Sequence, residues 1–320
     1  MSEFSLIEKF FRQPAHKNEA VRVGIGDDAA VLAFPEDQQL VVCVDTLVQG
    51  THFLPNTPPE ALGHQALAVN LSDMAAMGAT PCWFTLALTM PEENDTWLAA
   101  FSQGLLTLAD VYKMSLIGGD TTQGPLAITV QVLGIVPPGL AILRSGAKTG
   151  DKIYVTGHLG DAALGLAMLE NRVTIAADQR AYLQQRYQRP DARVEVGEQL
   201  RDLATSAIDI SDGLAADLSH ILTESRAAAI IYAKDLPLSA ELKNSVPISQ
   251  ALMLALTGGG DYELCFTVPA TRHVEVEQII KTCQVPCTCI GEITASGGLQ
   301  IIGLDEKPLH LNKLGWEHFL

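Results

Sequence analysis

Short apolar runs alternate with amphipathic stretches along the whole chain. The runs have the length and the β-branched content of buried strands: VRV, QLVVCV, WFTLALTM, ITVQVLGIV, KIYVTG, AIDIS and DYELCFTV. Apolar residues at helical spacing predict helices between them, at 4–11, 59–78, 95–113, 160–170 and 213–224. This alternation predicts α/β or α+β layers in both halves, and it argues against a helical bundle or a sandwich.

Details of three segments matter for the chemistry that follows. The strand at 39–44 is expected to end at Asp45, and SLIGGDTT is expected to run from a strand into a glycine turn. On the helix at 59–78, Asn70 and Asp73 are three residues apart and share a face. Pro14 to Ala20 is expected to be a polar connection.

A turn-rich segment divides the chain. With 320 residues the chain exceeds the usual size of a single core. Residues 137–150 combine prolines and glycines, so we expect a boundary near residue 145, between an N-terminal domain (1–145) and a C-terminal domain (146–320). The order of the strands within each domain does not follow from spacing.

The net charge of the chain makes some classes of binding partner unfavourable. Lys and Arg number 21 against 37 Asp and Glu, a net charge of −16, which disfavours nucleic acids and anionic membranes. The first twelve residues carry two Glu where a signal peptide would be basic and then apolar, and we expect a cytoplasmic protein. Cys283, Cys287 and Cys289 could hold zinc, but no His is close in sequence, and we interpret them as buried structural residues.

Aspartates at strand ends or beside glycine recur through the chain. They stand in Asp27-Asp28, Asp45-Thr46, Ser72-Asp73, Gly118-Gly119-Asp120, Asp209-x-Ser211-Asp212 and Gly260-Asp261. Carboxylates gathered from such positions repel one another unless a hard cation neutralises them, and Mg²⁺ bridges carboxylates to phosphate oxygens. The pattern therefore predicts a site for a magnesium polyphosphate. The alternative is that each Asp only caps a helix or stabilises a turn.

Two other nucleotide sites are less consistent with the sequence. There is no G-x-x-x-x-G-K-[ST], so a P-loop is absent. Residues 24–29 fit the dinucleotide pattern G-x-G-x-x-A, with Asp45 where a ribose-binding acid would stand. However, Asp27 and Asp28 would face the pyrophosphate, and Pro35 leaves little room for the crossover helix.

The motifs together resemble the thiamine-monophosphate kinase family, within the superfamily of aminoimidazole-ribonucleotide (AIR) synthetase and selenophosphate synthetase. The resemblance runs from about residue 4 to 319 through GIGDDAAV, VDTLVQGTHF, NLSDMAAMGATP, LIGGDTT, RSGAKTGD, YVTGHLGDAALGL, AIDISDGL, GGGDYELCFTV and GWEHF. It implies a two-domain AIR-synthetase-like fold whose N-terminal half contributes strands to a β-barrel in a homodimer.

The resemblance also implies roles for particular residues. The implied Mg²⁺ ligands are Asp28, Asp45, Asp73, Asp120, Asp209 and Asp212. Gly119, Asp120, Arg144 and Ser211 resemble contacts to ATP, and Asp120, Asp212 and Arg144 are the implied catalytic residues. His52, Glu263 and Trp316 fall where the family holds thiamine monophosphate. Two positions depart from the family pattern: Cys43-Val44 replaces residues that are often hydroxylic, and Gly260 replaces an acidic residue.

Elementary chemistry bears on four of these residues. Arg144 beside a glycine turn can bind phosphate with two hydrogen bonds. Trp316 can stack on a cationic ring or can instead close the core. His52 can be a binding residue or only a turn residue. Glu263 lies in an apolar strand, where a Glu is uncommon unless it pairs with a cation.

The resemblance therefore implies a kinase that uses ATP and Mg²⁺ to phosphorylate thiamine monophosphate directly, without a phosphorylated protein intermediate. Two alternatives stay open at this point. One is another ATP-dependent member of the superfamily, and the other is a sensor that binds magnesium nucleotide without turnover.

Overall fold

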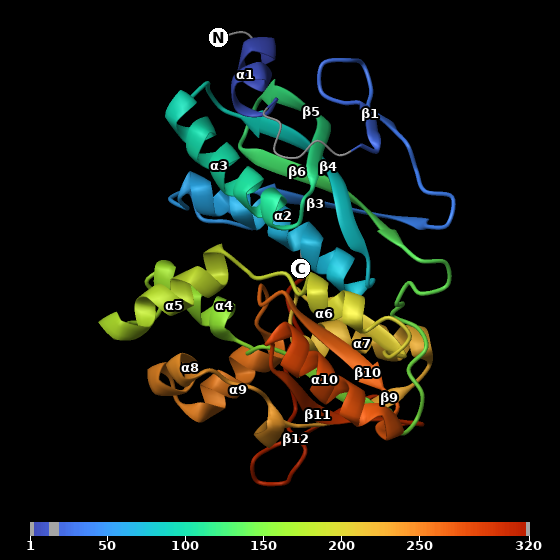
Figure 1. The fold of residues 1–320 in the computed structure, drawn as a ribbon. Helices are drawn as coiled ribbons and strands as arrows, with labels where there is room; N and C mark the ends of the chain where they lie inside the picture. Colours follow the sequence, from blue (N-terminus) through green and yellow to red (C-terminus); the bar gives the residue numbers. More distant parts are fainter. Residues whose placement is uncertain (1–2, 13–18, 318–320) are drawn as a thin grey trace. The chain divides into compact units, whose positions relative to one another are not determined.

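The computed structural model describes residues 3–12 and 19–317. The chain divides into two compact units, one of residues 1–74 and 79–139 and the other of 75–78 and 140–320. Both contain helices and strands, so the prediction of mixed layers in each half is confirmed (Figure 1). The expected polar connection at 14–20 falls mostly outside the described residues. The boundary expected near residue 145 stays a prediction.

The first unit is built on a four-stranded sheet in the order β3-β6-β4-β5. Its neighbours pair antiparallel except β4 and β5, which are parallel. Two short strands pair separately, and three helices complete the unit. The elements are α1 (Glu3–Phe10), β1 (Val21–Val23), β2 (Val31–Leu32), β3 (Gln39–Val48), α2 (Pro59–Ala76), β4 (Thr80–Met90), α3 (Asp95–Val111), β5 (Ser115–Gln123) and β6 (Ala127–Val136).

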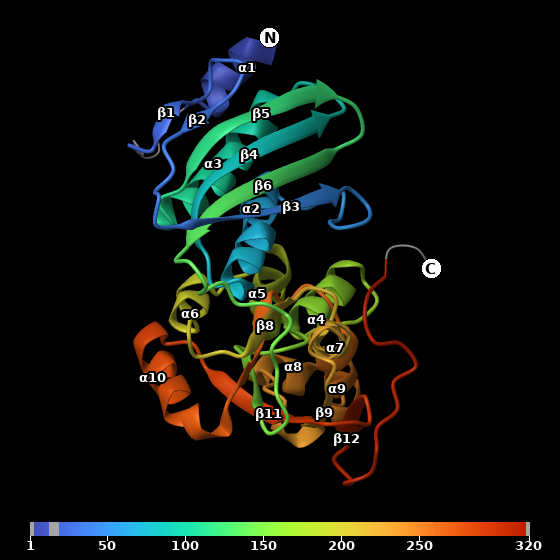
Figure 2. The ribbon, with the colours of Figure 1, turned by 90° about the vertical axis from the view of Figure 1, so that its right-hand side faces the viewer.

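Helices α2 and α3 lie on one face of this sheet, and Figure 2 shows the opposite face toward the viewer. Every second residue of β6 is buried, including Ile128, Val130 and Val132, as expected for a strand with one covered face. The predicted apolar stripe of α2 is buried, and so is Asn70 on the same helix. Asn94 caps α3, because its side chain accepts a hydrogen bond from the Trp97 N–H.

Two strands of the first unit are longer than predicted. Strand β3 continues past Asp45 to Val48, because its pairing with β6 extends to Val48 and Ala127. The expected glycine turn after SLI is wrong, since β5 runs through Gly118, Gly119 and Asp120 while paired with β4. Asp45 and Asp120 therefore project from the middle of strands and not from their ends.

The second unit contains a six-stranded mixed sheet in the order β12-β9-β11-β7-β10-β8. All neighbours pair antiparallel except β12 and β9. Its elements are β7 (Lys152–Thr156), α4 (Asp161–Leu169), α5 (Ala177–Gln188), α6 (Val194–Gln199), β8 (Ser206–Ile210), α7 (Leu214–Ser225), β9 (Ala228–Tyr232), η1 (Ala233–Asp235), α8 (Ala240–Ser245), α9 (Ile248–Thr257), β10 (Glu263–Val268), η2 (Ala270–Arg272), α10 (His273–Cys283), β11 (Cys287–Thr294) and β12 (Leu299–Ile302).

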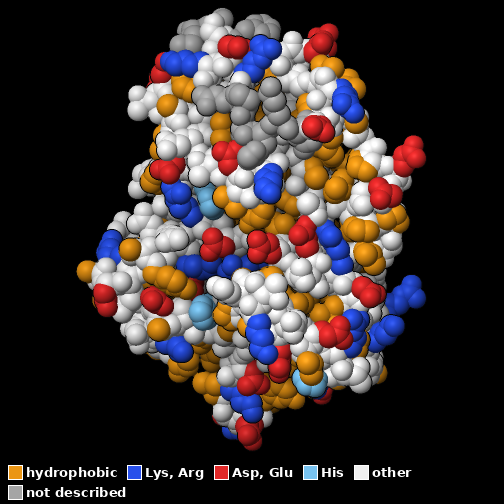
Figure 3. Space-filling model, viewed as in Figure 1, with side chains coloured by type: hydrophobic (Ala, Val, Ile, Leu, Met, Phe, Trp, Pro, Cys, Tyr) orange, Lys and Arg blue, Asp and Glu red, His pale blue; other side chains and the backbone are white. Residues whose placement is uncertain are grey.

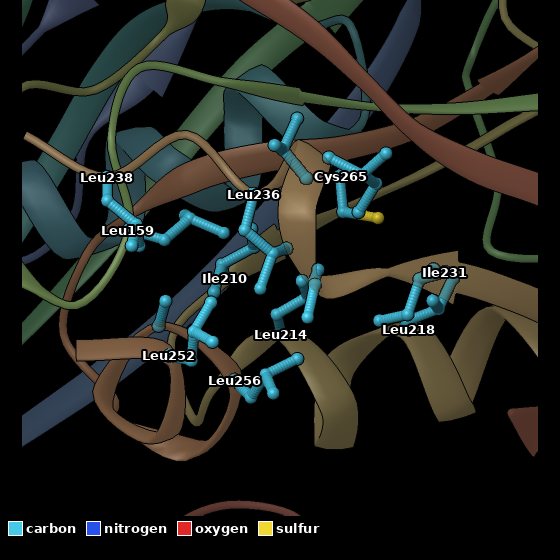
Figure 4. Packing of buried hydrophobic residues seen from close by; sticks show 14 of the residues in the cluster. Leu159, Ile210, Leu214, Leu218, Ile231, Leu236, Leu238, Leu252, Leu256 and Cys265 are labelled. Atoms are coloured by element: carbon cyan, nitrogen blue, oxygen red, sulfur yellow. The ribbon is translucent and has the colours of Figure 1, made fainter. Parts of the chain in front are cut away.

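The core of the second unit joins its sheet to α4, α7 and α9. Figure 4 shows Ile210 of β8 and Cys265 of β10 close to Leu214 and Leu218 of α7. Burial of such side chains is the main stabilising contribution to the unit. The cysteines near β11 are not buried as expected: Cys283 and Cys287 are half-buried and Cys289 is exposed.

The surface carries both signs of charge. On the face shown in Figure 3, acidic and basic side chains are interspersed. No described helix is long and apolar enough to cross a bilayer.

Candidate active site

The first unit brings Asp45, Asp73 and His52 together. Asp45 lies in β3, and Asp73 lies one turn from the end of α2. Burial raises the pKa of Asp45, while a hydrogen bond with Asp73 and the charge of His52 lower it. A contact between two acidic groups requires a shared proton or a cation, so this pair suits a hard divalent ion.

Cys43 occupies a position where the family pattern often has a hydroxyl. Its thiol donates to the backbone oxygen of Asn70 at 3.4 Å. Burial and the nearby charges of Asp73 and Asp45 raise the pKa of the Cys43 thiol. Cys43 is therefore a protonated thiol packed against α2, beside Asp45 and Asp73.

His52 lies in the turn that follows β3, and its ring orientation is fixed. The Val48 N–H donates to His52 Nδ1 at 2.9 Å. Because Nδ1 accepts this bond, the neutral ring carries its proton on Nε2. His52 is therefore a turn residue whose ring is held by the backbone of β3.

A pocket of about 840 Å³ within the first unit contains Asp28, Gly119 and Asp120. Its walls come from α1, the 25–30 segment, β4 and β5. Gly119 has a structural requirement of its own, because a Cβ there would lie 1.9 Å from the Leu86 backbone oxygen. The glycine allows β4 and β5 to pair next to Asp120.

In the second unit the turn from Ser211 to Gly213 connects β8 to α7. Asp209, at 5% exposure, lies near the end of β8, and Asp212 lies in the turn. The Gly260 N–H donates to the Ser211 backbone oxygen at 2.8 Å, and the Trp316 N–H donates to the Asp212 backbone oxygen at 2.9 Å. The glycine-rich segment before β10 and the C-terminal segment therefore both hold this turn.

Asp217 holds the same turn from α7 and was not predicted as a site residue. Its Oδ2 accepts hydrogen bonds from the N–H groups of Asp212 and Gly213, both at 3.0 Å. Burial, followed by the charges of Asp209 and Asp212, raises the pKa of Asp217 to about 7. The three acidic side chains are thus close enough to repel one another.

Arg144 stands in an exposed turn of the second unit. Its backbone oxygen accepts from Ser225 Oγ, which in turn accepts from the N–H groups of Gly146 and Ala147. The guanidinium is left on the surface of this turn. An exposed guanidinium can bind a phosphate without first breaking a buried ion pair, so that energetic cost is avoided.

Glu263 pairs with cations, as its apolar strand predicted. Arg193 donates to both carboxylate oxygens at 2.6 Å, and Arg186 donates to Oε1 at 2.9 Å. Thr156 donates to Oε2 at 2.6 Å. Burial alone would raise the pKa of Glu263, but these arginines lower it. With both oxygens occupied, Glu263 holds Arg186 and Arg193 beside a pocket of about 280 Å³ that also contains His158.

Trp316 is 50% exposed, so it does not close the core of its unit. The Lys313 ammonium lies 5.6 Å from the centre of its ring. An indole that already faces a cation can also stack on a cationic ring of a ligand. Its backbone N–H donates to the Asp212 backbone oxygen, which places the Trp316 backbone next to the Ser211–Gly213 turn.

The six predicted metal ligands belong to two units. Asp28, Asp45, Asp73 and Asp120 lie in the first, and Asp209 and Asp212 lie in the second. Within residues 3–12 and 19–317, no three His, Cys, Asp or Glu side chains are gathered as a metal-binding group. The donors are nevertheless carboxylates, some already in contact, and this chemistry fits Mg²⁺.

Comparisons with known proteins find matches over most of the chain. Residues 26–136 match the family described as AIR synthase related protein, N-terminal domain, and residues 148–303 match its C-terminal domain. The thiamine-monophosphate kinase of Escherichia coli K12 is 51% identical over 319 residues, covering 99% of this chain and 98% of its own.

Solved structures extend the likeness to the fold. The crystal structure of thiamine-monophosphate kinase from Stenotrophomonas maltophilia K279a has a TM-score of 0.88 at 42% identity, covering 94% of this chain and 96% of its own. The structure of AaThiL complexed with AMPPCP and TMP has a TM-score of 0.78 at 32% identity, covering 99% and 97%.

Proposed function

This chain belongs to the AIR synthase related family and within it to the thiamine-monophosphate kinases, and we propose that it transfers the γ-phosphoryl group of ATP to the phosphate of thiamine monophosphate. The products are thiamine diphosphate and ADP. The observation that carries the proposal is the 51% identity across 99% of the chain to a kinase of this name. The solved relative that binds AMPPCP and TMP supports both substrates.

The reaction needs alignment more than it needs a base. An oxygen of the acceptor phosphate forms a bond to the γ-phosphorus as the bond to the bridging oxygen of ADP breaks. The attacking oxygen is already anionic, so no strong general base is required. Mg²⁺, when bound, would offset the repulsion between the two anions. The residues proposed to hold it are Asp28, Asp45, Asp73, Asp120, Asp209 and Asp212.

The chain's own groups supply the contacts. Gly119 and Asp120 are proposed to contact ATP from the large pocket of the first unit, and Arg144 and Ser211 from the second unit. His52 is proposed to contact the acceptor phosphate, with its ring held in place by the Val48 N–H.

Two further residues are proposed for the acceptor. Trp316 is half exposed at the surface of its unit, which suits stacking on the thiamine rings. Glu263 is buried, and both of its carboxylate oxygens already accept hydrogen bonds. Its contribution to acceptor binding is therefore proposed to act through Arg186 and Arg193.

Three finer features belong to the same proposal. The domains are 1–145, for Mg-ATP binding and dimerisation, and 146–320. The chain forms a homodimer through the first unit, supported by an exposed apolar row on β3: Leu40, Val42, Val44 and Val48. A cytoplasmic location is supported by six cysteines that form no disulfide.

A single assay tests the function. ADP release is measured with the protein, Mg-ATP and either thiamine monophosphate or thiamine as acceptor. Turnover is expected with the monophosphate alone and should stop in excess EDTA. The same rate of ADP release with either acceptor, or full turnover in EDTA, would contradict the proposal.

Two substitutions test the proposed metal ligands. Asp120→Asn and Asp212→Asn each remove a negative charge from the site, so we expect kcat to fall roughly 100-fold or more with a melting temperature at or above that of the wild type. Asp305→Asn is a matched control in an exposed turn, where Asp305 accepts from the Lys307 N–H. Near-normal kcat for either site variant would show that the residue only caps a turn.

A further inference from the structure

One buried carboxylate close to the proposed site has no role in the reaction described above. Asp217 is 3% exposed and lies in the first turn of α7. Both hydrogen bonds that the structure gives its side chain go to a single oxygen, Oδ2. The donors are the backbone N–H groups of Asp212 and Gly213, which precede the helix.

These bonds determine the position of Asp212. The backbone of Asp212 is held on both sides. Its N–H donates to the Asp217 carboxylate, and its backbone oxygen accepts from the Trp316 N–H. Gly213 follows with φ +125°, a conformation open to glycine, and a Cβ there would lie 2.9 Å from the Thr257 backbone carbon. With the backbone fixed in this way, the direction of the Asp212 Cα–Cβ bond is fixed as well.

We propose that Asp217 is a positioning residue, which fixes the Asp212 peptide so that the Asp212 carboxylate is preorganised for a divalent cation. This inference rests on the proposed function, because Asp212 is a metal ligand only within it. Asp217 itself does not need to touch the cation, since its bound oxygen already accepts two hydrogen bonds. Without it, Asp212 would have to be ordered at the moment the cation binds, and affinity would fall.

The geometry makes the test selective. An amide oxygen can accept both bonds that Oδ2 accepts, so Asp217→Asn keeps the positioning and removes the charge. Asp217→Ala removes both. We expect the Mg²⁺ concentration for half-maximal activity to rise about tenfold or more in Asp217→Ala and to stay within about threefold of the wild type in Asp217→Asn.

A matched control separates positioning from general stability. Asp151 is also a buried carboxylate of the second unit, and its Oδ2 accepts from the Lys148 N–H at 2.9 Å and from Thr205 Oγ1 at 2.7 Å. Asp151→Ala should lower the melting temperature while leaving the Mg²⁺ dependence unchanged. If Asp217→Ala behaves in the same way, Asp217 is only a helix cap and the inference is overturned.

Two further outcomes are decisive. If Asp217→Asn is as damaging as Asp217→Ala, Asp217 acts through its charge as a ligand, and positioning is wrong. Should Asp217→Ala fail to fold, Asp217→Glu replaces it, because it keeps the charge and displaces the carboxylate. Asp217→Glu is expected to raise the Mg²⁺ requirement at least fivefold, and a wild-type value would overturn the inference.

Calorimetry keeps this test distinct from the test of the function. Mg²⁺-dependent binding of ADP is measured for each variant without thiamine monophosphate. The same order of variants is expected there. A wild-type protein that binds Mg-ADP but makes no thiamine diphosphate would refute the proposed function, whereas equal Mg²⁺ dependence of ADP binding in all variants would refute the role of Asp217.

Discussion

Trp316 offers the sharpest test of acceptor identity at the scale of one residue. If the indole stacks on the thiamine rings, Trp316→Ala should raise KM for thiamine monophosphate about five- to thirtyfold, since such a contact contributes on the order of 1–2 kcal/mol. KM for ATP should not change, and neither should the melting temperature, because the ring is half exposed. Steady-state kinetics with each substrate varied would check this. Unchanged KM values for both substrates would remove Trp316 from the acceptor site.

The buried carboxyl group of Asp261 should make the free energy of unfolding depend on pH. It is fully buried and accepts hydrogen bonds from the Gly160 and Ala162 N–H groups, and burial raises its pKa to about 7. Because its folded pKa exceeds its unfolded pKa, its contribution to stability is complete below about pH 4 and is lost as the pH rises toward 7.

The comparison with a neutral variant isolates this effect. The free energy of unfolding of the wild type, relative to Asp261→Asn, should decrease by at most about 4 kcal/mol between pH 4 and pH 8. Urea unfolding at several pH values measures the difference. A difference that stays constant or grows with pH would show that burial does not raise the pKa of Asp261.

The candidate residues divide into those that the sequence could predict and those that it could not. Asp28, Asp120 and Asp212 stand in short motifs with glycine, and local spacing was enough to single them out. Arg186 and Arg193 meet Glu263 from 77 and 70 residues away, in a polar segment that carried no motif. Asp217 had a weak signal, as a second Asp five residues after Asp212, but only the structure shows which N–H groups it accepts from.

At the scale of elements, pairing between strands explains the main differences between the strands predicted from the sequence and those in the structure. Local sequence suggested that Gly118-Gly119 would break a strand, yet each glycine is paired with a residue of β4. The strand continues because the missing Cβ of Gly119 lets the Leu86 carbonyl approach. Cross-strand partners are not encoded in a short window, so neither the extent of β5 nor that of β3 could be predicted from it.

The two glycines form a matched pair for testing that argument. Gly119→Ala would place a Cβ 1.9 Å from the Leu86 oxygen, whereas a Cβ at Gly118 would meet nothing within 4 Å. Gly119→Ala should destabilise the protein by roughly 1–3 kcal/mol or more, and Gly118→Ala should change stability much less. Chemical denaturation of both variants is the measurement. Equal losses would show that the close approach of β4 and β5 is not what requires glycine.

The association of two chains is the prediction at the scale of the whole molecule. The outward-facing residues of β3 include Leu40, Val42 and Val44, each about half exposed, and β3 is an edge strand of its sheet. Burial of such a row against a second copy would be favourable, and a charge placed within it would be buried without a partner.

Val42→Glu is therefore expected to give monomers at concentrations where the wild type is dimeric. Val274→Glu on α10 is the control, since Val274 is 61% exposed in the other unit. Sedimentation velocity distinguishes the two states. A wild-type protein that is monomeric, or a Val42→Glu variant that stays dimeric, would exclude this face as the interface.

Side chains of β3 alternate between the two faces of the sheet, and this alternation limits how the length of the strand can change during evolution. Cys43 and Asp45 face Asn70 and Asp73 of α2, while Val42 and Val44, which alternate with them, face outward. Inserting or deleting one residue within the strand would exchange the two faces, turning the carboxylate outward and a valine toward α2. Changes of length are therefore expected only in the segments on either side of β3.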